Sequence, residues 1–175
     1  MSSFCTYFAP IPAYAIIVSV EINVLIDDRL GECLDAGWLQ SVVEQVLIAQ
    51  DVSSEAEVGL VITSQERVQQ LNRNYLGKDA PTDVLAFSML SAGEESSSFV
   101  PPPDGVTHLG EVIISYPQAV IQAAEQGHSI KKEIAILIIH GVLHLLGYGD
   151  EKPEPKRQMT AKEREIMSYI ESRLK

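Results

Sequence analysis

Cysteine is scarce in this sequence, which carries only Cys5 and Cys33 among its 175 residues. Two cysteines so far apart exclude a disulfide framework, and they also exclude the CxxC pair of a metal or redox centre. Disulfides persist in oxidising compartments and are rare in the cytosol. The composition therefore predicts reduced thiols and a cytoplasmic location.

Basic residues are few as well. The chain has 13 Lys and Arg against 24 Asp and Glu, which gives a formal net charge of −11. A protein that coats nucleic acid by bulk attraction carries charge of the opposite sign. Any RNA must therefore be held by a local basic patch or by a bound metal.

A long apolar run that could span a membrane is also missing. Glu21, Asp27 and Asp28 interrupt the hydrophobic N-terminal stretch before it reaches the length of about 20 residues that a span needs, and it lacks the basic start of a signal peptide. We expect an N-terminal tail over residues 1–14 and no contact with a membrane.

Hydrophobic residues make up 46% of the chain, enough for one sizeable core and a single domain over residues 1–175.

Four stretches of the sequence are rich in Val and Ile and have the pattern of buried or half-buried strands. They cover residues 16–26, 57–64, 82–90 and 109–115. Between the last two lies a segment dominated by Ser, Pro and Gly, and this composition predicts a flexible loop over residues 91–107.

Five helices are predicted between and after these strands from helical spacing, caps and stops. They are expected near residues 39–47, over 65–75, from Ser115 to Gly127, over 131–146 and from about Thr160. In the last helix, Thr160 and Glu163 form a T-x-x-E pattern that resembles a capping box. Helices interleaved with a few strands, two of which follow each other directly, favour an α/β or α+β fold with a small mixed four-stranded sheet.

Two histidines stand four positions apart in the apolar run IAILIIHGVLHLL. On a helix, His140 and His144 lie one turn apart on the same face, so both rings can reach one divalent metal. The alternative is a pair of core histidines bonded to backbone carbonyls. Because the run is apolar nearly all round, the helix should be buried, and buried imidazoles need partners. The pattern therefore favours a metal site.

A third ligand is expected shortly after this helix. Gly147 suits the helix stop, so the chain can turn back there and bring Asp150 or Glu151 towards the histidines. Two neutral imidazoles and one carboxylate, with a fourth position open, form a catalytic zinc arrangement. Nickel and other first-row metals accept the same set, so the sequence predicts one divalent ion, with zinc as the expected one.

Gly141 argues against a peptidase of the HExxH type. In those enzymes the residue after the first histidine is a glutamate that acts as general base. Glycine has no side chain that could take up a proton. A peptidase of that type would therefore lack its base here.

Three segments of the chain resemble the YbeY family, the metal-dependent endoribonucleases of bacterial ribosomal RNA maturation. HGVLHLLGYGD is similar to that family's H-G-x-L-H-L-x-G-Y-D-H signature, and LNRNYLGKDAPTDVLAF and LGEVIIS resemble its two other characteristic segments. The resemblance covers the chain from about residue 55 to the end. It implies a zincin-like α/β fold and a zinc ion held by three side chains. It also implies cleavage of single-stranded RNA at the 3′ end of 16S ribosomal RNA, and quality control alongside the small ribosomal subunit.

The chain departs from the family pattern at two positions. Asp150 stands where the family has its third histidine, and its negative charge should make the metal a weaker Lewis acid. Leu76 stands where the family has an arginine thought to assist phosphate chemistry, and leucine cannot donate hydrogen bonds to a phosphate. Arg73 and Lys78 are the nearest basic residues and become the predicted substrate contacts. The alternative is that both are solvated charges beside a turn.

Several other residues are expected to have structural roles. Thr82 and Asp83 should fix the turn into the third strand. Trp38 and Tyr75 are expected to be partly buried packing residues.

Three functions remain open at this point. The favoured one is a zinc-dependent endoribonuclease in which the metal site activates water for attack on an RNA phosphodiester. The second is a noncatalytic ribosome-assembly factor that keeps the scaffold with weakened chemistry. The third is a metal-dependent hydrolase with another substrate, such as a peptide.

Overall fold

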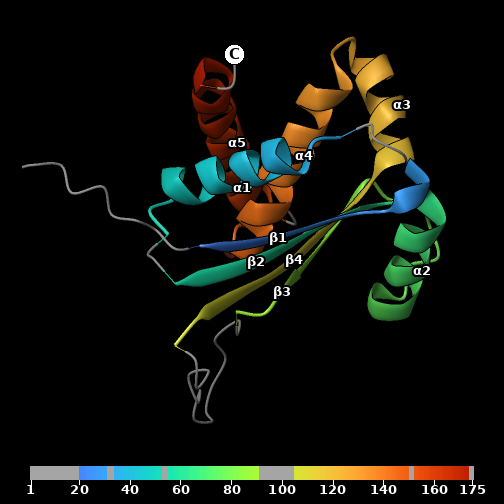
Figure 1. The fold of residues 1–175 in the computed structure, drawn as a ribbon, viewed down its shortest axis with the longest axis horizontal. Helices are drawn as coiled ribbons and strands as arrows, with labels where there is room; N and C mark the ends of the chain where they lie inside the picture. Colours follow the sequence, from blue (N-terminus) through green and yellow to red (C-terminus); the bar gives the residue numbers. More distant parts are fainter. Residues whose placement is uncertain (1–19, 31–33, 53–54, 91–104, 150–151, 174–175) are drawn as a thin grey trace, which may run out of the picture.

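The computed structural model describes residues 20–30, 34–52, 55–90, 105–149 and 152–173 (Figure 1). Its strands are β1 (Glu21–Ile26), β2 (Ala56–Thr63), β3 (Val84–Ser88) and β4 (Thr107–Ser115). They form one sheet in the order β1-β2-β4-β3. β1, β2 and β4 run parallel, and β3 pairs antiparallel with β4. The predicted small mixed sheet of four strands is thus confirmed.

The described part of the chain contains five α-helices and a short 3-10 helix, η1 (Asp28–Leu30). The α-helices are α1 (Ala36–Ala49), α2 (Gln65–Leu76), α3 (Tyr116–Gln126), α4 (Ile130–Leu145) and α5 (Pro153–Arg173). α1 and α4 pack on one face of the sheet, and α5 packs on both of them. α2 lies on the opposite side of the sheet (Figure 1). The α/β fold expected from the sequence is therefore confirmed.

Serine side chains cap the N-terminal ends of α2 and α3. Ser64 Oγ accepts from the backbone N–H of Arg67 at the start of α2, and Ser115 Oγ accepts from Gln118 at the start of α3. α3 ends at Gly127, which has a φ of +68° as the predicted left-handed stop requires. These contacts satisfy backbone groups that a helix end leaves without partners.

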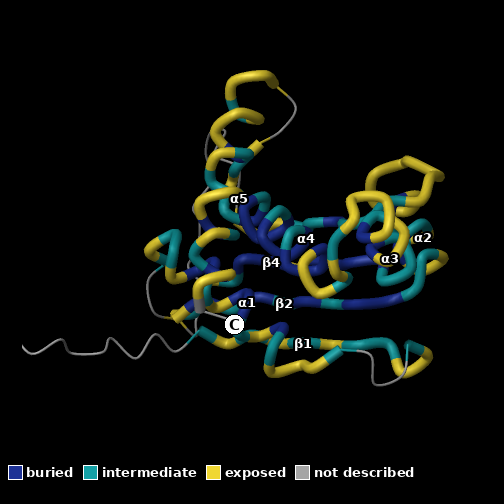
Figure 2. The backbone as a smooth tube through the Cα atoms, turned by 90° about the horizontal axis from the view of Figure 1, so that it is seen from above, coloured by how far each residue is buried: buried dark blue, intermediate teal, exposed yellow. Residues whose placement is uncertain are grey.

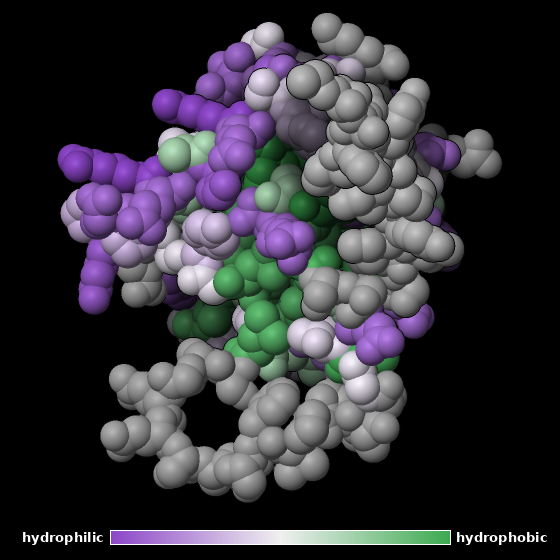
Figure 3. Space-filling model, turned by 90° about the vertical axis from the view of Figure 1, so that its left-hand side faces the viewer, coloured by the Kyte–Doolittle hydropathy of each residue, from purple (hydrophilic) through white to green (hydrophobic). Residues whose placement is uncertain are grey.

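The core lies mainly between the sheet and the α1–α4 layer. Leu60 and Ile62 of β2 are fully buried there, and α4 is buried along most of its length (Figure 2). On the other face of the sheet, Ile113 of β4 packs with Val68 of α2 in a second, smaller cluster. α2 covers this face only in part, since Leu25 of β1 is 61% exposed. Apolar side chains also gather in the middle of the face seen from the left of Figure 1 (Figure 3).

The last helix begins earlier than the sequence pattern indicated. α5 starts at Pro153, not at about Thr160, because proline is tolerated in the first turn, where its missing N–H has no helical partner. Thr160 and Glu163 therefore lie inside the helix, and the predicted capping box is wrong. β4 also begins at Thr107, two positions before the predicted start at Leu109.

Some expectations concern residues that the structure does not describe. The predicted tail over residues 1–14, the first residues of the predicted strand and most of the loop over residues 91–107 lie outside the described ranges. Within those ranges, no helix combines the length and the apolar character that crossing a membrane requires.

Candidate active site

His140 and His144 form the centre of the site on α4. Their Nε2 atoms lie 3.0 Å apart, and their ring centroids are 4.6 Å apart at an angle of 77° between the planes. The four-residue spacing puts both rings on one helix face, as the sequence predicts. The two nitrogens that could ligate a metal therefore face each other.

The separation of these nitrogens fits a shared metal ion. Zinc–imidazole bonds of 2.0 to 2.1 Å in a tetrahedral site place two ligand nitrogens about 3.3 Å apart. A change of a few tenths of an ångström at two half-buried rings would therefore suffice. The donor pair has the chemistry and the arrangement that a divalent ion needs.

Glu163 of α5 holds the far side of the His140 ring. Its Oε1 accepts a hydrogen bond from Nδ1 of His140 at 2.7 Å. Because a carboxylate only accepts, the ring hydrogen lies on Nδ1, and Nε2 presents its lone pair towards His144. Carboxylates that orient metal-binding histidines in this way raise ligand basicity. This role of Glu163 differs from the helix cap that the T-x-x-E pattern predicts.

A sequence signal for Glu163 did exist. Met159, Ile166 and Ile170 are buried at helical spacing on α5, and position 163 falls on the same stripe. A carboxylate within an apolar stripe needs a partner, and His140 of the facing helix α4 supplies it.

Gly141 allows α4 to lie close to the sheet. A Cβ atom added at this position would meet Cγ1 of Val112 on β4 at 2.4 Å, well inside van der Waals contact. The lack of space beside Val112 therefore explains why a glycine stands between the two histidines. The same glycine leaves a peptidase of the HExxH type without its general base. The position of the histidine pair depends on this close approach.

The histidine pair opens into a cleft of about 530 Å³ between α4, α2 and β3. Lys78 and Leu76 both line this cleft together with His140 and His144. Arg73 does not line it. Its Nη1 lies 3.8 Å from Oδ2 of Asp79, in an exposed ion pair. The structure thus brings one of the two predicted substrate contacts to the histidines and leaves the other away from them.

The turn that carries Lys78 is fixed by side-chain hydrogen bonds. Asn72 donates to the carbonyl oxygen of Ala80 at 2.8 Å, and Asp83 Oδ1 accepts from the backbone of Val84 at 2.8 Å and from Thr82 Oγ1 at 3.1 Å. The expected turn-fixing role of Thr82 and Asp83 is confirmed. Lys78 therefore projects from a defined loop at the mouth of the cleft.

A second cavity, of about 450 Å³, also borders His140 and is acidic. Asp83, Glu125, Glu133 and Glu163 all line it. Glu133 is 6% exposed, and burial raises its pKa, whereas His128 at 3.1 Å opposes this shift. Asp83 also lines the Lys78 cleft, but Glu125, Glu133 and Glu163 do not, and they make this cavity unfavourable for a phosphate. The Lys78 cleft, where one ammonium group faces one carboxyl group, is therefore the more favourable approach to the histidines for an anion.

The predicted third ligand lies outside the described residues, because these stop at Gly149 and resume at Lys152. Among the residues that are described, no group of three His, Cys, Asp or Glu side chains surrounds one point. The chain does turn back after α4, as expected from Gly147, whose φ is +92°. Tyr148 then anchors the turn through a 2.8 Å hydrogen bond to Gln50, the residue that follows α1. Asp150 as ligand, with Glu151 as the alternative, stays a prediction.

The expectation that Tyr75 is a partly buried packing residue is wrong. This side chain is 70% exposed, because it lies near the end of α2, where the helix covers only part of the sheet. Trp38 is half-buried, as expected, and Lys131 lies 5.0 Å from its ring centroid.

Comparisons with known proteins agree on one family. The model of the family described as Endoribonuclease YbeY matches residues 30–171. Endoribonuclease YbeY of Dehalococcoides mccartyi is 43% identical over 155 residues, which cover 86% of this chain and 97% of the relative. The protein of the same name from Roseiflexus castenholzii is 42% identical over 152 residues, covering 86% and 93%.

A solved structure supports the fold. The solution structure of a Thermotoga maritima protein superposes with a TM-score of 0.55 over 83% of this chain and 86% of that one, at 24% sequence identity. The family model and the relatives together cover most of the sequence, including α4 and its histidines. The chain belongs to the YbeY endoribonuclease family.

Proposed function

We propose that this chain is a metal-dependent endoribonuclease that cleaves single-stranded RNA. The observation that carries the proposal is the facing pair of imidazole nitrogens, 3.0 Å apart, in a cleft that also contains Lys78. Membership of a family of endoribonucleases supports RNA as the substrate.

Each residue of the site has a separate task in this proposal. His140 and His144 would hold one ion, expected to be zinc, with Asp150 or Glu151 as the third ligand. Such an ion supplies Lewis acidity at a phosphodiester and makes a water molecule more acidic. Glu163 keeps the lone pair of His140 directed at His144. Lys78 supplies positive charge for a phosphate oxygen at the mouth of the cleft.

The electrostatics of the two cavities set the direction from which RNA arrives. The acidic cavity beside His140 is unfavourable for phosphate, while the other cleft contains both histidines and the positive charge of Lys78. A single strand can lay one phosphate in this cleft more readily than a duplex, whose backbone is held at a fixed spacing. We propose the 3′ end of 16S ribosomal RNA as the substrate, in the cytoplasm and alongside the small ribosomal subunit, because the family resemblance implies this.

A second candidate is a noncatalytic ribosome-assembly factor on the same scaffold. Leu76 favours it, because this 52% exposed side chain lines the cleft where an arginine is expected from the family pattern. Arg73 is directed to Asp79 and does not replace that arginine in the cleft. A noncatalytic factor would bind RNA and leave it intact.

The test is cleavage of an end-labelled single-stranded RNA by the wild-type chain, with metal content measured on the same sample. Cleavage should stop with a chelator, return with added zinc, and be absent in His140→Ala. His108→Ala is the matched control, because His108 pairs with Glu57 away from the cleft. RNA binding without cleavage by the zinc-loaded protein would favour the assembly factor. Cleavage of casein but not of RNA would favour the third function, a hydrolase with a peptide substrate.

A further inference from the structure

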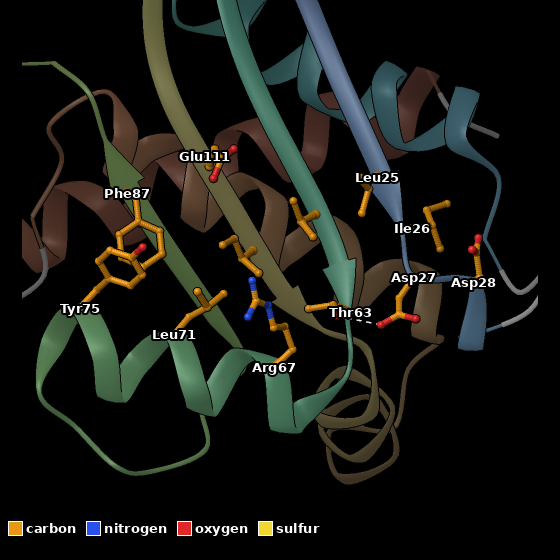
Figure 4. Close-up of a pocket in the computed structure, with 12 residues that line it drawn as sticks. Leu25, Ile26, Asp27, Asp28, Thr63, Arg67, Leu71, Tyr75, Phe87 and Glu111 are labelled. Atoms are coloured by element: carbon orange, nitrogen blue, oxygen red, sulfur yellow. Dashed lines mark hydrogen bonds between the residues drawn. The ribbon is translucent and has the colours of Figure 1, made fainter.

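A large cavity lies on the face of the sheet opposite to α4. It measures about 800 Å³ and is bordered by α2 and by all four strands (Figure 4). Val61, Ile113 and Leu71 form an apolar floor and wall, and Tyr75 and Phe87 close one end. Nothing in the metal site uses this space.

Tyr75 and Phe87 form a supported aromatic pair at that end of the cavity. Their ring centroids lie 5.4 Å apart with an angle of 62° between the planes, so Phe87 meets Tyr75 edge to face. Phe87 is half-buried on β3, whereas Tyr75 is 70% exposed. Phe87 therefore supports the Tyr75 ring, and most of the Tyr75 side chain is exposed, so another planar ring can stack on it.

Arg67 directs a positive charge over the same cavity. Its side chain extends from α2 towards the sheet in Figure 4. Its guanidinium donates to Gln70 Oε1 at 2.9 Å and, within the described part of the chain, forms no ion pair with a carboxylate. Asp27, by contrast, is already bound by Arg29, at 2.9 and 2.6 Å. The side of the cavity formed by α2 is therefore the favourable one for an anion.

Two further carboxyl groups line the cavity, Glu111 of β4, which pairs with Phe87 across the sheet, and Asp28. A phosphate cannot lie against these carboxylates, but an uncharged planar group can. The occupant that fits has a flat aromatic part for the Tyr75 end and an anionic part for Arg67. A nucleotide of a single strand has both, because its base is uncharged and its phosphate is not.

The cavity and the metal site share one helix. Tyr75 lines the cavity and Leu76, the next residue, lines the cleft of His140 and His144. A strand that crosses the end of α2 can therefore reach both. We propose that the cavity takes one unstacked base of the RNA strand, stacked on Tyr75 with its phosphate near Arg67, while another phosphate of that strand lies in the histidine cleft. This inference rests on the proposed function.

Binding of a short labelled single-stranded RNA to the zinc-loaded protein tests the proposal, with phosphorothioate linkages in the RNA so that cleavage does not interfere. Tyr75→Ala should raise the Kd by about 5- to 100-fold, the range for loss of one base–aromatic stack, and Tyr75→Phe should stay within about twofold of wild type. Ile121→Ala is the matched control, since this exposed side chain of α3 lies on neither cavity. Arg67→Gln should make the salt slope of log affinity shallower by about 0.7, whereas Tyr75→Ala should leave the slope unchanged.

RNAs with one abasic position, moved along the strand, identify the base that stacks. The penalty of Tyr75→Ala should vanish when the abasic position falls at the cavity. Wild-type affinity in Tyr75→Ala would overturn the proposal. So would a Tyr75→Ala protein that binds RNA normally and has lost binding to a small-subunit protein, since the cavity would then be a protein-docking surface. If the wild-type chain binds no RNA at all, the proposed function itself fails, which separates the two outcomes.

Discussion

Glu163 Oε1 lies 2.7 Å from Nδ1 of His140, so a carboxylate on α5 orients a histidine on α4. The two residues are far apart in sequence, and the contact joins the C-terminal helix to the centre of the site. Because Nδ1 is occupied by this hydrogen bond, Nε2 is the nitrogen that faces His144. α5 therefore contributes to the histidine site as well as to the core.

The first prediction concerns this contact. Glu163→Ala should weaken zinc affinity by about 10- to 100-fold, because the His140 ring loses the group that fixes its orientation and raises its basicity. Glu163→Gln should show a smaller loss, since an amide oxygen still accepts the hydrogen bond. Competition with a coloured chelator measures the affinity. Glu165→Gln serves as control, because Glu165 pairs with Lys162 at 2.9 Å on the exposed side of the same helix. If Glu163→Ala and Glu163→Gln bound zinc as tightly as the control Glu165→Gln, the contact would have only a structural role.

The second prediction concerns the third ligand. Asp150→Ala should weaken zinc retention, whereas Asp150→His should keep the metal and increase RNA cleavage at neutral pH, because imidazole adds no negative charge to the ion. Metal analysis after gel filtration and cleavage of labelled RNA provide the two readouts. Glu151→Ala is the comparison. If that variant loses the metal and Asp150→Ala does not, Glu151 is the ligand.

A third prediction follows from the space at Gly141. Gly141→Ala should lower the free energy of unfolding by about 1–3 kcal/mol, because the new methyl group meets Val112 and forces α4 away from β4. Zinc affinity should fall as well, since the two histidines move with the helix. Urea unfolding and chelator competition measure these effects. Gly149→Ala is the control, because a Cβ there approaches nothing nearer than 3.9 Å. Wild-type stability in Gly141→Ala would mean that Val112 can yield at no cost.

Local signals in the sequence predict much of this site. The i, i+4 spacing places His140 and His144 on one face, and Ser64 begins α2 as its side chain suggests. Such features depend on residues within one or two helical turns. The sequence therefore gives their geometry without knowledge of the tertiary fold.

Features that depend on contacts between distant segments were predicted less well. Glu163 was assigned to a cap because two prolines obscured the start of α5, and its true partner lies on another helix. Arg73 was grouped with Lys78 by proximity in sequence, but the turn after α2 sends only Lys78 to the cleft. The exposure of Tyr75 depends on where α2 stops covering the sheet, which no periodicity reveals.

A fourth prediction concerns the pH dependence of stability. Arg29 donates three hydrogen bonds to Asp27, two from its guanidinium and one from its backbone N–H, and Thr63 donates a fourth at 3.0 Å. Together these bonds hold the pKa of Asp27 well below its usual range. A depressed carboxyl pKa stabilises the folded state above the unfolded pKa, and this contribution is lost as the pH falls towards the folded pKa. Asp27→Asn should therefore be less stable than wild type at about pH 7, with the difference shrinking below about pH 4.

Urea unfolding at several pH values measures this difference. Asp28→Asn is the matched control, since Asp28 is the exposed neighbour of Asp27. The difference in stability between Asp27→Asn and wild type could also stay constant down to acid pH. Its cause would then be packing or the neutral hydrogen bonds, and not the charge of Asp27.

The fifth prediction concerns the salt dependence of RNA binding. With a net charge of −11, the protein offers no bulk attraction, so binding must depend on the metal and on few basic side chains. The slope of log affinity against log salt should be shallow, roughly −1 to −3, because each phosphate contact on a single strand contributes about −0.7. Lys78→Ala should flatten it more than Arg73→Ala, since only Lys78 lines the histidine cleft. The double variant should keep its metal. A steep slope, or one that Lys78→Ala does not change, would place the RNA on another surface.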